Sequence, residues 1–173
     1  RRLLDVGGGS GGVSIAVVGQ HPHLEATVTE LPTVTPLTRR YIAAAGLEQR
    51  ISVAEVDMLV GPPSGLYDVA VLKSFLQVFG PGEAQRALGH VAAAVRPGGT
   101  IFILGQGIVT DDRLQPATAA VANIALLSFY SEGQAYTLSE YSAWLEAAGC
   151  VVAEIVEDKD QLMVVARRSD PSP

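Results

Sequence analysis

The sequence predicts a doubly wound α/β domain whose sheet is mostly parallel and ends in an antiparallel edge hairpin. Apolar, strand-like runs alternate with helical segments along most of the chain, and strands joined by right-handed helical crossovers form parallel sheets. Two last apolar runs, 151–156 and 161–167, are separated only by charged residues 157–160, too few for a parallel crossover. The length of 173 residues is that of one domain, which we expect to cover residues 1–168, with 169–173 as a frayed polar tail.

Each element follows from a local pattern. The first strand, residues 2–6, is an apolar run that ends in a glycine cluster. Similar apolar or β-branched runs predict strands at 26–29, 51–54, 67–72 and 101–104. Helices are predicted at 12–19, 35–46, 83–95, 115–130 and 138–148. The third of these is expected to be terminated by residues 96–99, and the last begins with a capping box formed by Thr137 and Glu140.

Composition excludes several classes of function. The 12 basic and 18 acidic residues give a net charge of −6, which disfavours binding to nucleic acid or to an anionic membrane surface. An apolar content of 48% excludes disorder, and no apolar run reaches the ~18 residues of a membrane span. The single cysteine excludes a disulfide framework and a multi-cysteine metal site, so we expect a reducing, cytoplasmic location and no metal.

The glycine loop after the first strand is the first candidate site. Gly7, Gly9 and Gly11 follow one another at alternate positions, where glycine lets a ligand approach the backbone at the start of a helix. This spacing differs from the G-x-G-x-x-G of dinucleotide folds. Asp5, two residues earlier, would repel a pyrophosphate but favour an ammonium or sulfonium group. The other interpretation is that the loop is only a tight turn.

Glu30, at the end of the second strand, is the second candidate. A carboxylate there can accept hydrogen bonds from both hydroxyls of a ribose. An adenosine with a positively charged tail describes S-adenosylmethionine (SAM) better than NAD, although an NAD-dependent oxidoreductase remains an alternative. Glu30 can also be interpreted as a solvated acid at a strand end.

Several motifs in order resemble one enzyme family. Leu4 to Gly11 is similar to the first motif of SAM-dependent O-methyltransferases of the plant caffeate/hydroxyindole type and their bacterial polyketide-tailoring relatives. The resemblance continues through residues 30–32, 55–58, 71–73, 97–99 and 137–149. It implies the Rossmann-like catalytic domain of a class I methyltransferase of secondary metabolism, acting on a small-molecule hydroxyl. It also implies an N-terminal dimerisation domain that is absent here, so the chain is expected to be the C-terminal part of a homodimeric protein.

The resemblance assigns roles to named residues. The motif glycines would line the methionine moiety of SAM, Glu30 would hold the ribose, and Met58 with Asp57 would flank the adenine. The full set of implied cofactor-binding residues is Asp5, Gly7, Gly9, Gly11, Glu30, Leu31, Asp57, Met58 and Lys73. Lys73 is also expected to be a buried ammonium, which needs a partner. Taken alone, Asp57 can be a loop cap and Met58 a core residue.

The apolar helix at 115–130 is expected to face the absent domain or the substrate. The alternative is that it is buried within this chain. Tyr130 and Tyr136 are candidates for the acceptor pocket, Cys150 for a buried thiol, and the three histidines for solvated residues.

One position departs from the family pattern. Gln77 stands where the plant-type enzymes have the histidine that takes the proton of the acceptor hydroxyl. A glutamine amide can orient a hydroxyl but is no base. Because a general base contributes about 10²- to 10⁴-fold, methyl transfer by proximity and orientation is still expected. The alternative is a SAM-binding relative that does not transfer methyl.

Overall fold

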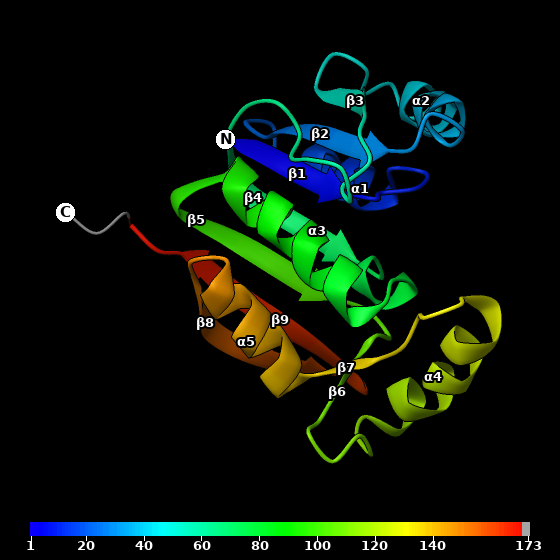
Figure 1. The fold of residues 1–173 in the computed structure, drawn as a ribbon. Coiled ribbons are helices and arrows are strands. Elements are labelled where there is room, and N and C mark those ends of the chain that lie inside the picture. The colour runs from blue at the N-terminus through cyan, green and yellow to red at the C-terminus, as the bar shows by residue number, and fades with distance from the viewer. Residues whose placement is uncertain (171–173) are drawn as a thin grey trace.

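The computed structural model describes residues 1–170 and contains a seven-stranded sheet in the order β3-β2-β1-β4-β5-β9-β8 (Figure 1). The parallel strands are β1 (Arg2–Val6), β2 (Glu25–Glu30), β3 (Ile51–Glu55), β4 (Tyr67–Lys73) and β5 (Val95–Leu104). At one edge, β8 (Cys150–Asp158) and β9 (Gln161–Arg168) run antiparallel to each other, and β9 runs antiparallel to β5. The predicted doubly wound sheet with its antiparallel hairpin is therefore confirmed.

Helices cover both faces of the sheet because strand side chains alternate between the faces. Leu3 packs in a core cluster with side chains of α1 (Gly12–Gln20) and α2 (Thr35–Ala44). Leu4 packs in a second core cluster with α3 (Pro81–Ala94) and α5 (Leu138–Ala147). The capping box predicted for α5 is present, since the Thr137 hydroxyl accepts from the Glu140 backbone N–H and Glu140 accepts from that of Thr137. Two apolar layers thus hold the carboxyl ends of β1, β2 and β4 at one edge.

The segment 96–99 follows the end of a helix, as predicted, and is part of the next strand. The helix ends at Ala94 and the chain continues directly as β5 from Val95. Val95 pairs with Tyr67 and Thr100 pairs with Val69, so the residues between them form a bulge on β5. Gly98, with φ of 73°, accommodates it. Residues 96–99 have no paired residues on β4, and they separate α3 from the regular part of β5 as a bulge rather than as a loop.

A small layer lies outside the main sheet. It holds a 3-10 turn, η1 (Leu76–Val78), a two-stranded parallel sheet of β6 (Ile108–Val109) and β7 (Tyr136–Thr137), and α4 (Ala117–Phe129). Helix α4 projects from one corner of the fold (Figure 1). Ala119 is its buried residue, whereas Val121, Ile124, Leu127 and Phe129 are 61 to 81% exposed. The interpretation that this helix is buried within the chain is wrong.

At the C-terminus, the backbone N–H of Ser169 still donates to the carbonyl of Gly149 at 3.0 Å. Residues 171–173 of the predicted tail lie outside the described residues. Within residues 1–170, no helix is long and apolar enough to cross a membrane.

Candidate functional site

The glycine loop between β1 and α1 adopts a backbone that favours glycine. Gly7, Gly9 and Gly11 have φ of 58°, 57° and 77°, in the left-handed region that side chains disfavour. A Cβ added to Gly9 would meet no atom within 4 Å, so the loop is open there. A Cβ on Gly7 would lie 2.4 Å from the ring of Phe75. The loop thus presents bare backbone to a ligand on its open side.

Asp5 lies beneath this loop and is 1% exposed. Its Oδ2 accepts from the hydroxyl of Ser14 at 2.7 Å and from the backbone N–H of Ser14 at 3.2 Å. Its Oδ1 is buried and has no hydrogen-bond partner among residues 1–170. Burial raises the pKa of this carboxyl above its usual value, although the bonds from Ser14 and the charge of Lys73 oppose the shift. An unpaired, desolvated carboxylate oxygen attracts a cationic group of a ligand.

Glu30 is turned toward the glycine loop. Its Oε1 accepts from the backbone N–H of Gly9 at 2.8 Å, and its Oε2 accepts from that of Leu31 at 3.0 Å. On the other side, the hydroxyl of Thr38 donates to the carbonyl of Gly9 at 2.5 Å. The peptide units on both sides of Gly9 are therefore fixed, and the Glu30 carboxylate keeps free lone pairs for a ligand hydroxyl.

Two cavities adjoin the loop and share Gly7. One, of about 350 Å³, is lined among others by Glu30, Leu31, Asp57 and Met58. The other, of about 470 Å³, is lined among others by Asp5, Gly9 and Lys73. All the predicted cofactor-binding residues except Gly11 therefore line one of two neighbouring cavities. Gly11 instead caps the N-terminus of α1.

The structure shows the environment of three of these residues, which the sequence alone could not determine. Asp57 Oδ1 accepts from the backbone N–H of Leu59 at 2.8 Å, so Asp57 closes a turn and also lines the cavity. Met58 is 4% exposed and likewise combines both interpretations, core residue and cavity wall. Lys73 is exposed at the end of β4, so the expectation of a buried ammonium is wrong. The carboxyl end of a strand opens into the crevice rather than into the core.

Gln77 lies in η1 and lines neither cavity. It is 7% exposed and packs against Gly107, where an added Cβ would lie 2.6 Å from the Cβ of Gln77. A role in orienting an acceptor therefore requires the acceptor to enter from this side, and that role stays a prediction.

Sequence reasoning missed two residues next to the cavities. Phe75 lies against Gly7 and lines the cavity of Glu30. His90 is half-buried, and its Nδ1 lies 2.8 Å from the carbonyl oxygen of Met58, so the expectation that it is solvated is wrong. The signal for His90 was its position on α3 beside the buried Val91, at the edge of the apolar face. Phe75 gave no such signal, because its direction depends on Ser74, whose φ is 54°.

Two of the remaining candidates are core residues, whereas Tyr130 is 43% exposed and its place in an acceptor pocket stays a prediction. Tyr136 is fully buried and its hydroxyl donates to the carbonyl of Phe79, so it is a core residue rather than part of an open pocket. Cys150 is buried as predicted. Within residues 1–170, no three histidine, cysteine or acidic residues are grouped so that they could hold a metal ion.

Comparisons with known proteins identify the family to which the chain belongs. A model of the O-methyltransferase domain matches residues 1–151. The chain is 39% identical over 151 residues to a 3-hydroxy-5-methyl-1-naphthoate 3-O-methyltransferase of Streptomyces sahachiroi, covering 87% of the chain and 43% of that relative. It is 32% identical over 153 residues to an aclacinomycin 10-hydroxylase of Streptomyces purpurascens, covering 88% of the chain and 40% of that relative.

A solved structure shares the whole fold. The structure of an O-methyltransferase family protein from Burkholderia thailandensis superimposes with a TM-score of 0.90 at 27% identity, over 99% of this chain and 52% of that one. The chain thus spans less than half the length of the two curated relatives. With a family model covering most of its length and the glycine loop, Glu30 and Met58 assembled around one crevice, the chain belongs to the O-methyltransferase domain family, whose methyl donor is S-adenosylmethionine.

Proposed function

We propose that residues 1–168 form the catalytic domain of a cytoplasmic SAM-dependent O-methyltransferase that acts on a hydroxyl of a small aromatic or polyketide-like molecule. The observation that carries this proposal is the Glu30 carboxylate, held against the glycine loop at the mouth of a cavity that Met58 also lines. The family match supports the reaction. The naphthoate methyltransferase, a relative named for an aromatic hydroxyl, supports the acceptor class.

The two cavities fit the two halves of the methyl donor. Glu30 would accept hydrogen bonds from the ribose hydroxyls, and the apolar Met58 would pack against the adenine. In the second cavity, the charge of Asp5 would stabilise the ammonium, and the exposed Lys73 would bind the carboxylate of the methionine moiety. The open backbone at Gly9 leaves room for that moiety.

SAM supplies an electrophilic methyl group on a sulfonium. Glu30 and Met58 on one side, and Asp5 and Lys73 on the other, would hold this donor so that its methyl group could be transferred to the acceptor oxygen. Gln77 has no basic group and would not take the hydroxyl proton. The protein contributes by fixing donor and acceptor in line, which supplies much of the rate enhancement of a displacement. Gln77 donates or accepts one hydrogen bond that orients the acceptor hydroxyl.

A second candidate function is SAM binding without methyl transfer. Two observations favour it: the glutamine at position 77 and the similarity to a relative that is named as a hydroxylase. An NAD-dependent oxidoreductase is the least favoured alternative, since the desolvated Asp5 repels a pyrophosphate.

Titration calorimetry of the 173-residue chain with SAM and S-adenosylhomocysteine tests cofactor binding. Glu30→Gln is expected to weaken both affinities about 10- to 100-fold, because it removes a charged acceptor. Glu55→Gln is the matched control. Glu55 pairs with Glu30 across the strands but accepts from Arg39 and Thr35, so its loss is expected to change affinity less than about twofold. Absence of binding by folded chain, or binding of NAD instead, contradicts the proposal.

Transfer is tested separately, with the full-length protein, labelled SAM and a panel of phenols. Label in the phenol ether supports the transferase. Tight cofactor binding with no label transferred to any phenol favours the non-transferring relative.

We further propose that the full-length protein is a homodimer through an N-terminal domain, and that α4 packs against that domain. The exposed apolar side chains of α4 support this, since patches of this kind mark interaction sites.

A further inference from the structure

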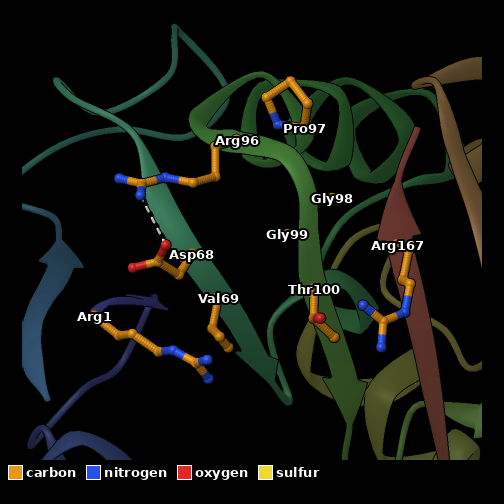
Figure 2. A pocket seen from close by; sticks show the side chains of 9 residues that line it. All are labelled: Arg1, Asp68, Val69, Arg96, Pro97, Gly98, Gly99, Thr100 and Arg167. Atoms are coloured by element: carbon orange, nitrogen blue, oxygen red, sulfur yellow. Dashed lines mark ion pairs between the residues drawn. The ribbon is translucent and has the colours of Figure 1, made fainter. Parts of the chain in front are cut away.

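A third cavity, of about 480 Å³, lies at the amino end of β4, whereas the glycine loop follows the carboxyl end of β1. Figure 2 shows the residues that line this cavity. It surrounds the amino end of β4 and the bulge of β5, with Asp68, Val69, Arg96 and Thr100 in its lining. Lys73 marks the other end of β4, and the seven residues of this strand span about 20 Å. The cavity is therefore separate from the proposed cofactor site.

Three guanidinium groups and one carboxylate line this cavity: Arg1, Arg96, Arg167 and Asp68. Asp68 is already engaged, because its Oδ1 lies 2.9 Å from Arg96 Nη1 and its Oδ2 accepts from the backbone N–H of Arg2 at 2.7 Å. The side chains of Arg1 and Arg167 have no hydrogen bond or ion pair within residues 1–170. Three positive charges and one negative charge leave an excess of two, in a chain whose net charge is −6.

Two of the arginines reach toward the same part of the sheet. Figure 2 shows Arg1, just before β1, and Arg167, on β9, reaching toward Val69 and Thr100 from opposite sides, while the Arg96 guanidinium is turned toward Asp68. The Thr100 hydroxyl adds a donor between them, and Val69 with Pro97 adds apolar surface. Unpaired guanidinium groups that face one cavity repel one another unless an anion lies between them.

The bulge of β5 builds this site. A Cβ on Gly99 would lie 2.6 Å from Val95 Cγ1 and 2.8 Å from the carbonyl oxygen of Arg96, so the backbone closes here only because residue 99 is glycine. This close packing brings Arg96 back to Asp68, with which it forms an ion pair. The Pro97–Gly99 segment thus has a structural role at this edge that is independent of the glycine loop.

We propose that this cavity binds the phosphate group of a small organic phosphate. A phosphate monoester carries about −1.5 to −2 charges on one group at neutral pH, which matches the excess of two. Guanidinium groups bind phosphate oxygens in a bidentate manner. A cavity of about 480 Å³ is within the range of small-molecule sites, so it also holds the organic part against Val69 and Pro97.

Binding is measured by titration calorimetry of the 173-residue chain at low ionic strength, with pyrophosphate, ribose 5-phosphate and citrate as probes. We expect ribose 5-phosphate and pyrophosphate to bind, citrate to bind at least about fivefold more weakly, and added salt to weaken all three. Arg167→Gln and Arg96→Gln are each expected to weaken phosphate binding about tenfold. Arg86→Gln, an exposed arginine on α3, is the matched control and should change binding less than about twofold.

Thermal unfolding and SAM binding are measured on the same variants. Both are expected to be unchanged in Arg167→Gln, which distinguishes loss of this site from misfolding. The proposal is overturned by absence of phosphate binding at millimolar concentration, by equal losses in Arg167→Gln and Arg86→Gln, or by citrate binding as tightly as the phosphates.

Discussion

The ring of Phe75 rests directly on Gly7, so that a Cβ at position 7 would lie 2.4 Å from the Cδ2 of Phe75. The contact joins the end of β4 to the glycine loop at the residue that the two cofactor cavities share. Gly7 and Gly9 have nearly the same φ, 58° and 57°, but a side chain at position 7 would overlap Phe75, whereas a side chain at position 9 would not meet any atom.

Gly9→Ala is therefore expected to lower the free energy of unfolding by about 1–2 kcal/mol, the strain of a left-handed residue alone. Gly7→Ala adds the overlap with Phe75 and should be more destabilising. Urea unfolding of Gly7→Ala, Phe75→Ala and the double variant measures this. The double variant should be more stable than the sum of the single changes predicts, by about 1 kcal/mol. Strict additivity would show that the contact does not limit position 7.

Asp5→Asn is expected to stabilise the chain and to weaken SAM binding. Burial raises the pKa of Asp5 above its usual 3.8, so the folded chain binds more protons than the unfolded chain between that value and the folded pKa. The contribution of Asp5 to stability therefore falls as pH rises through this range. Asparagine does not titrate, so the stability advantage of Asp5→Asn should grow with pH over the same range and then stay constant.

Urea unfolding at several pH values measures that difference, and calorimetry should show SAM affinity reduced about tenfold. Ser14→Ala removes the hydroxyl hydrogen bond that lowers the pKa of Asp5, so it should widen the pH range over which stability falls. A wild-type chain that gains stability relative to Asp5→Asn as pH rises would contradict the assignment.

Gln77→His is expected to leave SAM affinity within about threefold of wild type, because Gln77 lines neither cofactor cavity and packs against Gly107 instead. Calorimetry with SAM checks this, with Gln85→His, an exposed position on α3, as the surface control. A hundredfold loss of affinity would place residue 77 in contact with the cofactor.

Charged substitutions on α4 test the proposed interface. Ile124 and Leu127 are 67% and 61% exposed, so Ile124→Glu with Leu127→Glu should change stability by less than about 0.5 kcal/mol. We expect the 173-residue chain to self-associate through this face at high concentration, and the double variant to sediment as a monomer.

Ala119 is the internal control on the same helix. It is 3% exposed and packs with Val109 and Ala135, so Ala119→Glu should destabilise the chain by more than about 2 kcal/mol. Unchanged self-association in the double variant would assign the contact to another surface.

The sheet was predictable from the sequence because its strands and helices have local signals: apolar runs, glycine stops and a capping box. Asp5, Glu30 and Lys73 were predictable as neighbours for a related reason, since the carboxyl ends of parallel strands meet at one edge. The bulge at 96–99 was not, because it depends on which residue of β4 pairs with Val95 and which with Thr100.

The directions in which individual side chains point could not be predicted from the sequence either. The bond between His90 and the Met58 carbonyl joins residues 32 positions apart, and it depends on how α3 lies against the loop after β3. The burial of Gln77 and the exposure of Lys73, only four residues away, depend on a change of chain direction at Ser74.

Helix α4 gives the fold an unusual freedom. Ala119 is its buried side chain within the described structure, so substitutions at its exposed positions, such as Val121, Ile124 and Phe129, are nearly neutral for folding. The exposed residues of this helix can therefore change during evolution, and the binding partner of the helix can change with them, while the sheet that carries the glycine loop stays intact. Within these 173 residues, the exposed face of α4 can vary in sequence, whereas the sheet and its packed helices determine whether the chain folds.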